Sequence, residues 1–334
     1  MPIVHFLNVK QGDCSLIEHS SGHLTVIDVC NASEPNRLQE AIVKRMAAAF
    51  KGVRGDFGQR NYPVNPISYM ADRGMASVFR FILTHPDMDH MDGIRLFFKV
   101  FRPLNFWDTD NNETKDFSDD ASGEFSEEDW NFYVGLRDGK PDTDPRRLTL
   151  YSGDRNKYFN LNDQGEGGGD GLNILAPTPG LLSEANETGD YNDSSYVLLY
   201  RTGVHRLLFG GDSHDKTWEH ILNTHEKSVT DVDVLIAPHH GRRSDRSYDF
   251  LDVVNPALTL FGNADSSDLA YGAFSSRGLP IITNNQAGSI LLDADKSPIE
   301  VYVTNRAFAE AVNGSTYAAA NHAGYYYHGL VERE

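Results

Sequence analysis

Cysteine is scarce in this chain, which contains only Cys14 and Cys30 among 334 residues. Both fall in apolar stretches that we expect to be strands, so we interpret them as small buried side chains rather than as a disulfide pair. Free thiols of this kind fit a reducing compartment, and we therefore expect a cytoplasmic protein.

Long apolar runs are also missing. No stretch reaches the roughly 18 consecutive apolar residues that a membrane-spanning helix needs, which excludes a span. The stretch from Met1 to Leu7 has neither a basic leader nor a cleavage site, and we interpret it as a first strand. We expect a stand-alone soluble domain, because hydrophobic residues make up 40% of the chain and can form a substantial core.

Basic residues are outnumbered, with 30 Lys and Arg against 48 Asp and Glu and a formal net charge of -18. This charge works against non-specific binding of polyanions. Much of it is local, because acidic residues crowd the stretch 110–129 around a single base, Lys115. We interpret residues 109–171 as an acidic insertion that ends in a glycine cluster. We expect it to project from the rest of the protein as a partly mobile segment.

What the sequence does contain is a dense run of polar residues from Thr84 to Gly93, reading T-H-P-D-M-D-H-M-D-G. The residues before it, 78–83, are apolar and of strand length, and residues 94–100 are apolar enough for a buried helix. Pro86 prevents one helix from running through the middle, so the polar residues lie on a strand-to-helix turn. Imidazoles and carboxylates converging on such a turn suit zinc, manganese or iron.

Helical spacing is clearest from Arg37 to Phe50, where Leu38, Ile42 and Met46 recur on one side of a predicted helix. Short apolar runs elsewhere predict strands that alternate with helices along most of the chain. Residues 317–334, rich in Ala and Tyr, match no pattern that we can interpret.

The turn resembles the H-x-H-x-D-H signature of the metallo-β-lactamase superfamily, with Asp87 in place of the second His. Its H-x-D-x-D-H form resembles the soluble hydrolase domain of DNA-uptake competence proteins of the ComEC type. Five further segments are similar to that group and occur in the same order: F-L-N-V-K-Q-G-D at 6–13, V-I-D at 26–28, N-D-S-S-Y-V-L at 192–198, L-L-F-G-G-D at 207–212 and P-H-H-G at 238–241.

The resemblance covers about residues 3–293 and implies an α/β protein with the four-layer αββα sandwich of the metallo-β-lactamase fold, in which two mixed β-sheets face each other. We assign residues 1–305 to one hydrolase domain that includes the acidic insertion. Residues 306–334 are left as a C-terminal tail of unknown role.

The same resemblance implies a metal site. The first metal position would use His85, Asp87 and the residue that replaces the third-motif His, here Asn192, a neutral and weaker ligand. The second would use Asp89, His90 and either His239 or His240, between which the sequence does not decide. Asp212 would bridge both positions, and Asp28 would hold the ligands in place without binding metal.

Asp87 and Asn192 make the first position rich in oxygen, which favours manganese, magnesium or weakly held zinc. We expect one or two divalent ions, with zinc or manganese as the leading identities. Such ions lower the pKa of bound water and create a metal-bound hydroxide. Asp89 or Asp87 would orient the water or accept its proton.

The leading functional hypothesis is a phosphodiesterase or nuclease that acts on a phosphorylated small molecule or a nucleic acid. Arg242, Arg243 and Ser244, which follow the P-H-H-G segment, are candidate phosphate-binding residues, although the arginines could equally face solvent. The alternatives are a hydrolase of lactams, lactones or thioesters and a non-catalytic binding module that kept the fold. The sequence gives no prediction of the oligomeric state.

Overall fold

The computed structural model describes residues 1–52, 55–118, 125–139, 145–162, 164, 167–244, 246–315, 321–322 and 324–333. Within these ranges the strands form two mixed sheets. The larger sheet has the order β15 (Asn321–His322), β16 (Tyr325–Val331), β14 (Ile299–Val303), β13 (Ile290–Asp293), β1 (Ile3–Phe6), β2 (Ser15–Glu18), β3 (Leu24–Ile27), β4 (Arg80–Ile82), β5 (Asn105–Trp107) and β6 (Arg146–Leu148). The smaller sheet has the order β12 (Ile281–Thr283), β11 (Leu258–Phe261), β10 (Val234–Ile236), β9 (His205–Phe209), β8 (Val197–Thr202) and β7 (Leu172–Ala176).

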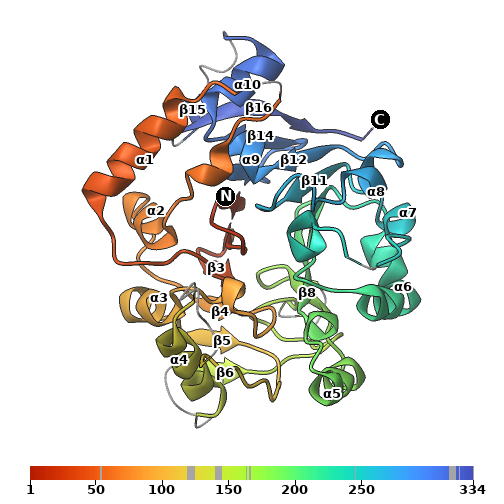
Figure 1. Cartoon of the computed structure of the whole chain (residues 1–334). Coiled ribbons are helices and arrows are strands. Elements are labelled where there is room, and N and C mark those ends of the chain that lie inside the picture. Colours follow the sequence, from red (N-terminus) through yellow and green to blue (C-terminus); the bar gives the residue numbers. More distant parts are fainter. Residues whose placement is uncertain are drawn as a thin grey trace.

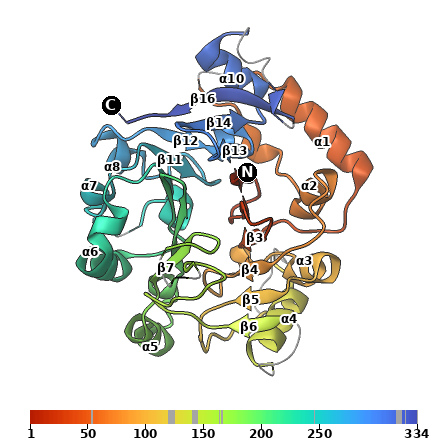
Figure 2. The same ribbon diagram turned by 180° about the vertical axis from the view of Figure 1, so that it is seen from behind.

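Helices flank the two sheets on opposite sides, as Figures 1 and 2 show from the front and from behind. The α-helices are α1 (Arg37–Ala49), α2 (Pro66–Asp72), α3 (Ile94–Phe101), α4 (Glu127–Arg137), α5 (Pro179–Thr188), α6 (Asp215–Val229), α7 (Leu251–Val254), α8 (Tyr271–Ser275), α9 (Asn284–Ala287) and α10 (Arg306–Asn313). The short 3₁₀ turns are η1 (Gln59–Asn61), η2 (Met88–His90), η3 (Asn192–Ser194) and η4 (Pro238–Gly241).

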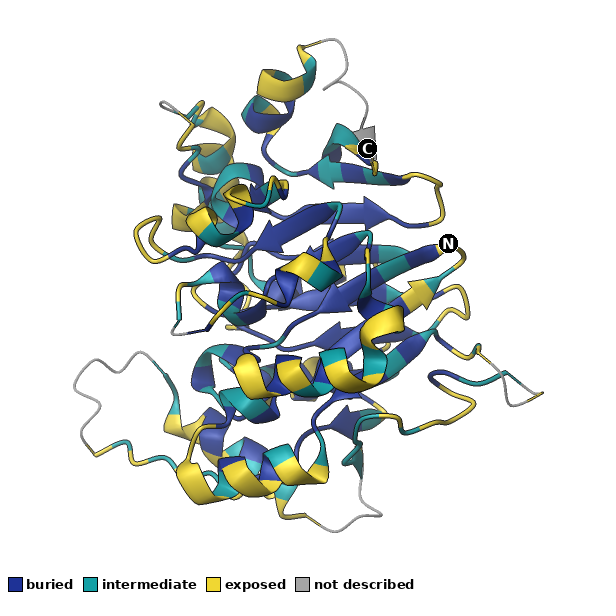
Figure 3. Cartoon of the chain, turned by 90° about the vertical axis from the view of Figure 1, so that its right-hand side faces the viewer, coloured by how far each residue is buried: buried dark blue, intermediate teal, exposed yellow. Residues whose placement is uncertain are grey.

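Three apolar cores hold these layers together. One lies between the sheets, where Ile82 of the larger sheet and Phe209 of the smaller sheet belong to the same buried cluster. A second packs the outer face of the larger sheet against α2, α3 and α4, and a third packs the smaller sheet against α6, α7 and α8. The strands in the middle of the sheets are accordingly buried, the edge strand β6 and strand β16 are partly exposed, and the outward sides of the helices are exposed (Figure 3). The predicted four-layer αββα sandwich is confirmed.

Strand directions decide where polar loops meet. In the larger sheet β3, β4, β5 and β6 run parallel, and in the smaller sheet β9, β10, β11 and β12 run parallel. The carboxyl ends of parallel strands lie at one edge of a sheet, and the loops that leave them can converge there. The polar segments that follow β3, β4, β9 and β10 all leave from such ends.

The stretch 109–171 differs from the projecting segment that we expected. Its helix α4 packs on α3, burying Trp130 and Tyr133 against the larger sheet. Its strand β6 extends that sheet by pairing in parallel with β5, and Phe159 joins the core between the sheets. For these described parts the expectation of a projecting segment does not hold, because it weighed the acidic composition and overlooked these few large apolar residues. Several of the acidic residues, including Asp119, Asp120 and Glu124, lie outside the described residues.

The remaining sequence-based predictions have mixed outcomes. Cys14 and Cys30 are buried and not bonded to each other, as expected. No helix among the described residues combines the length and hydrophobicity that crossing a bilayer demands. Residues 306–333, which had no predicted structure, contribute α10 and also β16, which pairs with β14. The helix α1 forms as predicted, but its apolar stripe is exposed.

Candidate metal centre

The candidate metal ligands lie where four strands end. Asp28 follows β3, Thr84 and His85 follow β4, Asp212 follows β9, and His239 and His240 follow β10. The two sheets thereby bring residues that are more than a hundred positions apart in sequence to one place.

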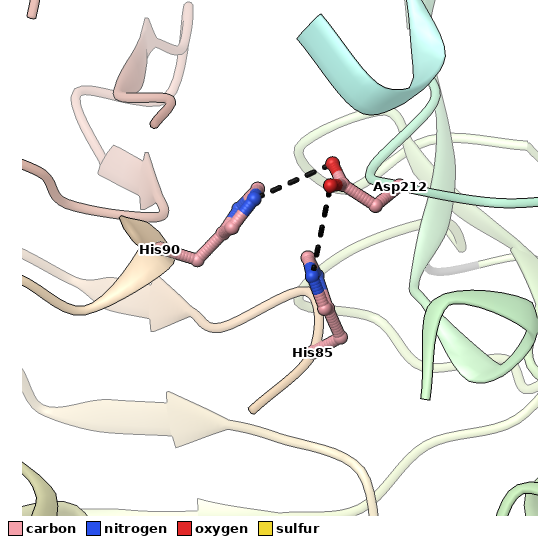
Figure 4. A group of neighbouring side chains, drawn as sticks. All are labelled: His85, His90 and Asp212. Carbon is pink, nitrogen blue, oxygen red and sulfur yellow. Dashed lines mark ion pairs between the residues drawn. The ribbon is translucent and has the colours of Figure 1, made fainter. Parts of the chain in front are cut away.

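Four imidazoles approach the carboxylate of Asp212 through their Nε2 atoms, and three of them are fully buried. The Nε2 of His90 lies 3.3 Å from Asp212 Oδ1, and those of His240 and His85 lie 3.6 Å and 3.8 Å from Asp212 Oδ2. Figure 4 shows His85 and His90 pointing toward Asp212 from the neighbouring sheet. The 3.3 Å contact is far below the roughly 8 Å separation at which these residues could no longer share a centre built from ligand bonds of about 2 Å.

The opposite nitrogen of each ring is held by another side chain. His90 Nδ1 donates to Asp28 Oδ2 at 2.8 Å, and Thr84 Oγ1 donates to the same oxygen at 2.7 Å. Because the Thr84 hydroxyl hydrogen is used in this way, its oxygen accepts from His85 Nδ1 at 3.0 Å. These contacts leave the Nε2 lone pairs of His85 and His90 facing the centre, which is the orientation that a metal ligand needs.

Asp13 contacts the ring of His240 as an ion-pair partner, since its Oδ1 lies 3.0 Å from His240 Nδ1, although neither atom makes a hydrogen bond among the described residues. The loop that carries Asp13 approaches the motif turn closely at Gly12. A Cβ on Gly12 would lie 1.7 Å from the carbonyl oxygen of Asp89, so only glycine fits there. This close contact between the two loops explains why a glycine precedes Asp13 in the Q-G-D segment after β1.

The backbone is in the left-handed region at three residues of the cluster, with φ values of 57° at Asp28, 54° at His239 and 56° at His240. Non-glycine residues adopt this region at a cost and do so most often at functional sites. Because His239 and His240 both adopt this conformation, the chain turns sharply after β10. The turn places the ring of His240 next to the carboxylate of Asp212.

Negative charge is concentrated around the buried rings. Burial acts to raise the pKa of Asp212, but the charges of His240, His90 and His85 hold it well below the usual value. Burial also acts against charge on His240, yet Asp13 and Asp212 raise its pKa to about 10. Burial likewise acts to lower the pKa of His90, but the charges of Asp212, Asp28 and Asp89 raise it. The carboxylates therefore demand positive charge at this point, from protons or from a cation.

The donor set fits a divalent cation on geometric grounds as well. Among the described residues, the Nε2 atoms of His85, His90 and His240 and the Oδ1 of Asp212 are buried without a hydrogen-bond partner. Buried polar atoms are rarely left in this state. Three overlapping groups have all their ligand atoms within 4.8 Å of one another: His85, His90 and Asp212; Asp89, His90 and His240; and Asp13, Asp212 and His240.

Asp87 stands apart from these groups and is more exposed. Its carboxylate lies 3.5 Å from His85 Nε2 and 3.2 Å from Lys115 Nζ, and 40% of its side chain is accessible. Burial acts to raise its pKa, but the contact with His85 and the charge of Lys115 lower it. Asp89, 24% accessible, contacts His240 Nε2 at 3.4 Å, and burial opposed by the His90 charge leaves its pKa at about 2.

The structure treats the two consecutive histidines differently. His240 is buried and belongs to two of the groups, whereas His239 is 24% accessible and reaches Asp212 at 3.8 Å. Burial, with the charges of Arg246 and Arg242, lowers the pKa of His239 to about 4 despite Asp212. Asn192 lies in η3, where its N–H donates to Asp190 at 3.3 Å. The ligand set itself stays a prediction.

The predicted phosphate-binding residues lie on the loop after η4. Arg242 is half-buried and its Nη2 donates to Gln11 at 3.3 Å, while Arg243 is exposed. Ser244 uses its hydroxyl to accept from Nε of Arg246, a residue that our sequence analysis did not single out. Arg246 is only 7% exposed.

Three residues at the cluster escaped the sequence analysis. Asp13 stood inside a quoted motif but received no role, and Lys115 was recorded only as the single base of an acidic run. Both signals were available in the sequence. Arg246 carried no such signal, because no feature of the neighbouring sequence distinguishes it from the exposed Arg243.

Comparison with known proteins gives likeness in structure alone. No protein-family model matches the sequence, and no curated protein matches it significantly. Among solved structures, the metallo-β-lactamase fold protein YhfI from Bacillus subtilis is similar with 10% identity and a TM-score of 0.40 over 84% of this chain and 95% of that one. A diphosphatase from the PhnP family is similar with 13% identity and a TM-score of 0.39 over 84% and 94%. The CmlA β-hydroxylase is similar with 12% identity and a TM-score of 0.45 over 87% of this chain and 53% of that one.

Proposed function

We propose that the protein is a metal-dependent hydrolase of phosphoester bonds. The observation that carries the proposal is the convergence of three buried imidazole Nε2 atoms on Asp212. The rings of His85 and His90 are hydrogen-bonded from behind by Thr84 and Asp28, and the ring of His240 contacts Asp13. Imidazoles fixed in this way, together with carboxylates, are a donor set for divalent cations.

His90, His240, Asp89 and Asp212 would hold one cation, and His85 and Asp87 would offer ligands to a second beside Asp212. A divalent ion bound there acts as a Lewis acid and lowers the pKa of water. The protein's own part is to orient the attacking water and to move its proton. Asp89 and Asp87 are the accessible carboxylates next to the centre, and their low pKa values leave them ionised and able to accept a hydrogen bond from water.

Phosphoesters are favoured over other substrates by the charges around the centre. Lys115 Nζ lies 3.2 Å from Asp87, and Arg242, two residues after His240, donates to Gln11, so cationic side chains are present near the candidate ligands. Cationic side chains next to a metal site suit a substrate that carries its own negative charge. A phosphodiester of a nucleotide or nucleic acid is the proposed substrate class.

The test is a substrate panel with added metals. Bis(p-nitrophenyl) phosphate, a p-nitrophenyl monophosphate, a lactam and a thioester would each be offered to protein supplied with Mn²⁺, Zn²⁺ or Mg²⁺. We expect metal-dependent release of product from the phosphoesters and its abolition by a chelator. Hydrolysis of the lactam or thioester alone would overturn the phosphoester assignment, and protein that binds no metal would overturn the hydrolase proposal.

A further inference from the structure

A cavity of about 380 Å³ lies at the edge of the larger sheet, apart from the candidate metal centre. Arg80, Asn105 and Arg146 line it, and they stand side by side as the first residues of the parallel strands β4, β5 and β6. The metal ligands instead follow the carboxyl ends of their strands. The cavity is therefore a second concave site at the opposite ends of the strands, and its volume falls within the range of about 300–1,000 Å³ that is typical of small-molecule sites.

The accessible charged groups of this cavity are mostly cationic. Arg146 and Arg155 line the cavity and are both exposed, so the cavity opens to solvent where these side chains lie. Asp154 is the only acidic residue that the described part of the chain contributes to the lining, and its carboxylate accepts from the Tyr151 N–H at 2.9 Å. In a protein with a formal net charge of -18, a cavity with this excess of arginine favours an anion.

The third arginine of the lining, Arg80, holds the cavity wall and is not available to a ligand. Its side chain is 1% exposed, and Nη2 donates to Asp170 Oδ2 at 2.6 Å and to the carbonyl oxygen of Tyr158 at 2.8 Å. Nη1 donates to Thr25 Oγ1 at 3.0 Å. These bonds join the loop that carries Tyr158 to β4, so this wall of the cavity is held to the sheet.

Aromatic rings form another part of the lining. Tyr158 is 50% exposed, and its ring centroid lies 6.3 Å from that of Phe79, with the two planes tilted by 46°. Phe79 is partly exposed, and its ring stacks on that of His23 with 3.7 Å between the centroids. Trp107 lines the buried part of the cavity. Aromatic surfaces of this kind bind flat rings by stacking and by edge-to-face contacts.

We propose that this cavity binds a small anion that carries an aromatic ring, such as a mononucleotide. Arg146 and Arg155 would bind its phosphate or carboxylate group through charge-assisted hydrogen bonds, and Tyr158 and Phe79 would contact its ring. The site goes beyond the proposed function, because it uses none of the candidate metal ligands and lies at the opposite ends of the strands. It binds its ligand with or without metal.

The experiment titrates four probes calorimetrically into metal-free protein: AMP, phenyl phosphate, adenosine and inorganic phosphate. AMP and phenyl phosphate carry both a ring and an anionic group, whereas adenosine and inorganic phosphate each carry one of the two. We expect AMP and phenyl phosphate to bind at least about 10-fold more tightly than adenosine or inorganic phosphate, because only they use both the arginines and the rings. Tighter binding of AMP than of phenyl phosphate would identify a nucleotide site, and the reverse a site for simpler aromatic anions.

Variants of the lining show where the probes bind. Arg146→Met and Arg155→Met should each weaken AMP binding about 10-fold and leave adenosine binding unchanged. Tyr158→Ala should weaken AMP binding by about the same factor and leave phosphate binding unchanged. The control Arg45→Met removes an equal charge from an exposed position on α1 and should bind AMP like the wild type. All four side chains are exposed, so the unfolding temperatures should change little.

The outcomes separate this inference from the proposed function. Binding of neither AMP nor phenyl phosphate would overturn the inference, as would equal AMP affinity in the wild type, Arg146→Met, Arg155→Met and Tyr158→Ala. AMP binding that is lost in Asp212→Asn and kept in these three variants would assign the anion to the candidate metal centre and overturn the inference as well. Retained AMP binding in protein that hydrolyses no ester with any metal would keep the cavity site and overturn the hydrolase proposal.

Discussion

The two sides of the candidate metal centre are built differently. On the inner side, His90 and His240 are fully buried and each ring is held by a carboxylate, Asp28 or Asp13. On the outer side, Asp87 is 40% accessible, and its close partners are His85 and Lys115. The rings of the inner side are thus fixed by carboxylates, whereas on the outer side the carboxylate is paired with a lysine.

This difference predicts unequal affinity for metals. Buried imidazoles oriented by carboxylates hold a borderline cation such as zinc firmly. An accessible carboxylate that shares its charge with Lys115 offers a harder and weaker position, which discriminates less against manganese and magnesium. We expect the inner side to keep its ion through purification and the outer side to fill only when metal is added.

The largest effect is expected from Asp212→Asn, because Asp212 is the group on which both sides depend. The substitution replaces a carboxylate that faces three imidazoles with a neutral amide, so both metal positions should lose most of their metal and hydrolysis should cease. Elemental analysis and the phosphoester assay measure this. Asp265→Asn, at an exposed position, is the control. Full metal content in Asp212→Asn would contradict the shared role.

A smaller loss is expected on the inner side from Asp28→Asn. The variant weakens the bonds that orient His90 and Thr84, and loss of such an orienting partner typically lowers metal affinity about 10- to 100-fold. Asp13→Asn should act in the same direction through His240. Competition with a chromophoric chelator gives both affinities. If both variants bind metal with the affinity of the wild type, Asp28 and Asp13 stabilise the loop conformations and do not orient the metal ligands.

On the outer side, Asp87→His should change metal preference rather than remove metal. A nitrogen ligand in place of the carboxylate oxygen raises zinc retention and reduces the response of the hydrolysis rate to Mn²⁺. Asn192→Ala is the companion variant and should alter metal content little, because an amide oxygen is a weak donor. If added Mn²⁺ does not increase the hydrolysis rate of the wild type, the outer side is not a position that prefers hard cations.

The smallest effect is expected from Lys115→Met. Its ion pair with Asp87 is partly exposed, so the loss of folding free energy should be about 0.5 kcal/mol or less. Removing the competing ammonium should at the same time strengthen manganese binding on the outer side. Denaturant unfolding and a manganese titration check the two parts. Weaker manganese binding in this variant would mean that Lys115 supports the site instead of competing for it.

The layers were implied by the resemblance to a known superfamily, and the ends of several strands were predicted because apolar runs are local signals. Strands β2, β7, β9, β11 and β14 begin and end where the hydrophobic pattern does. Strand β6, with the sequence R-R-L, carried no such pattern, since it forms only by pairing with β5. The helix α1 was predicted from Leu38, Ile42 and Met46, yet these side chains are 75%, 50% and 52% exposed. Periodicity indicates a helix but not what covers it.

The candidate site likewise contains residues that the sequence predicted and contacts that it did not. His85, His90 and Asp212 were predicted from motifs and lie together, but the preference of the geometry for His240 over His239 depends on two left-handed residues that no motif describes. The pairing of Lys115 with Asp87 and the burial of Arg246 come from contacts between distant segments. Contacts of this kind are determined by the fold as a whole, so one sequence alone does not reveal them.

The unequal affinity of the two sides is tested most directly by locating metals in crystals of the purified protein. Anomalous scattering measured at the zinc and manganese absorption edges, before and after soaking with Mn²⁺, identifies each ion and its ligands. We predict zinc retained among His90, His240, Asp89 and Asp212 before the soak, and manganese beside His85 and Asp87 only after it. Two zinc ions from the start with no uptake of manganese would contradict the account, as would an ion bound only on the outer side.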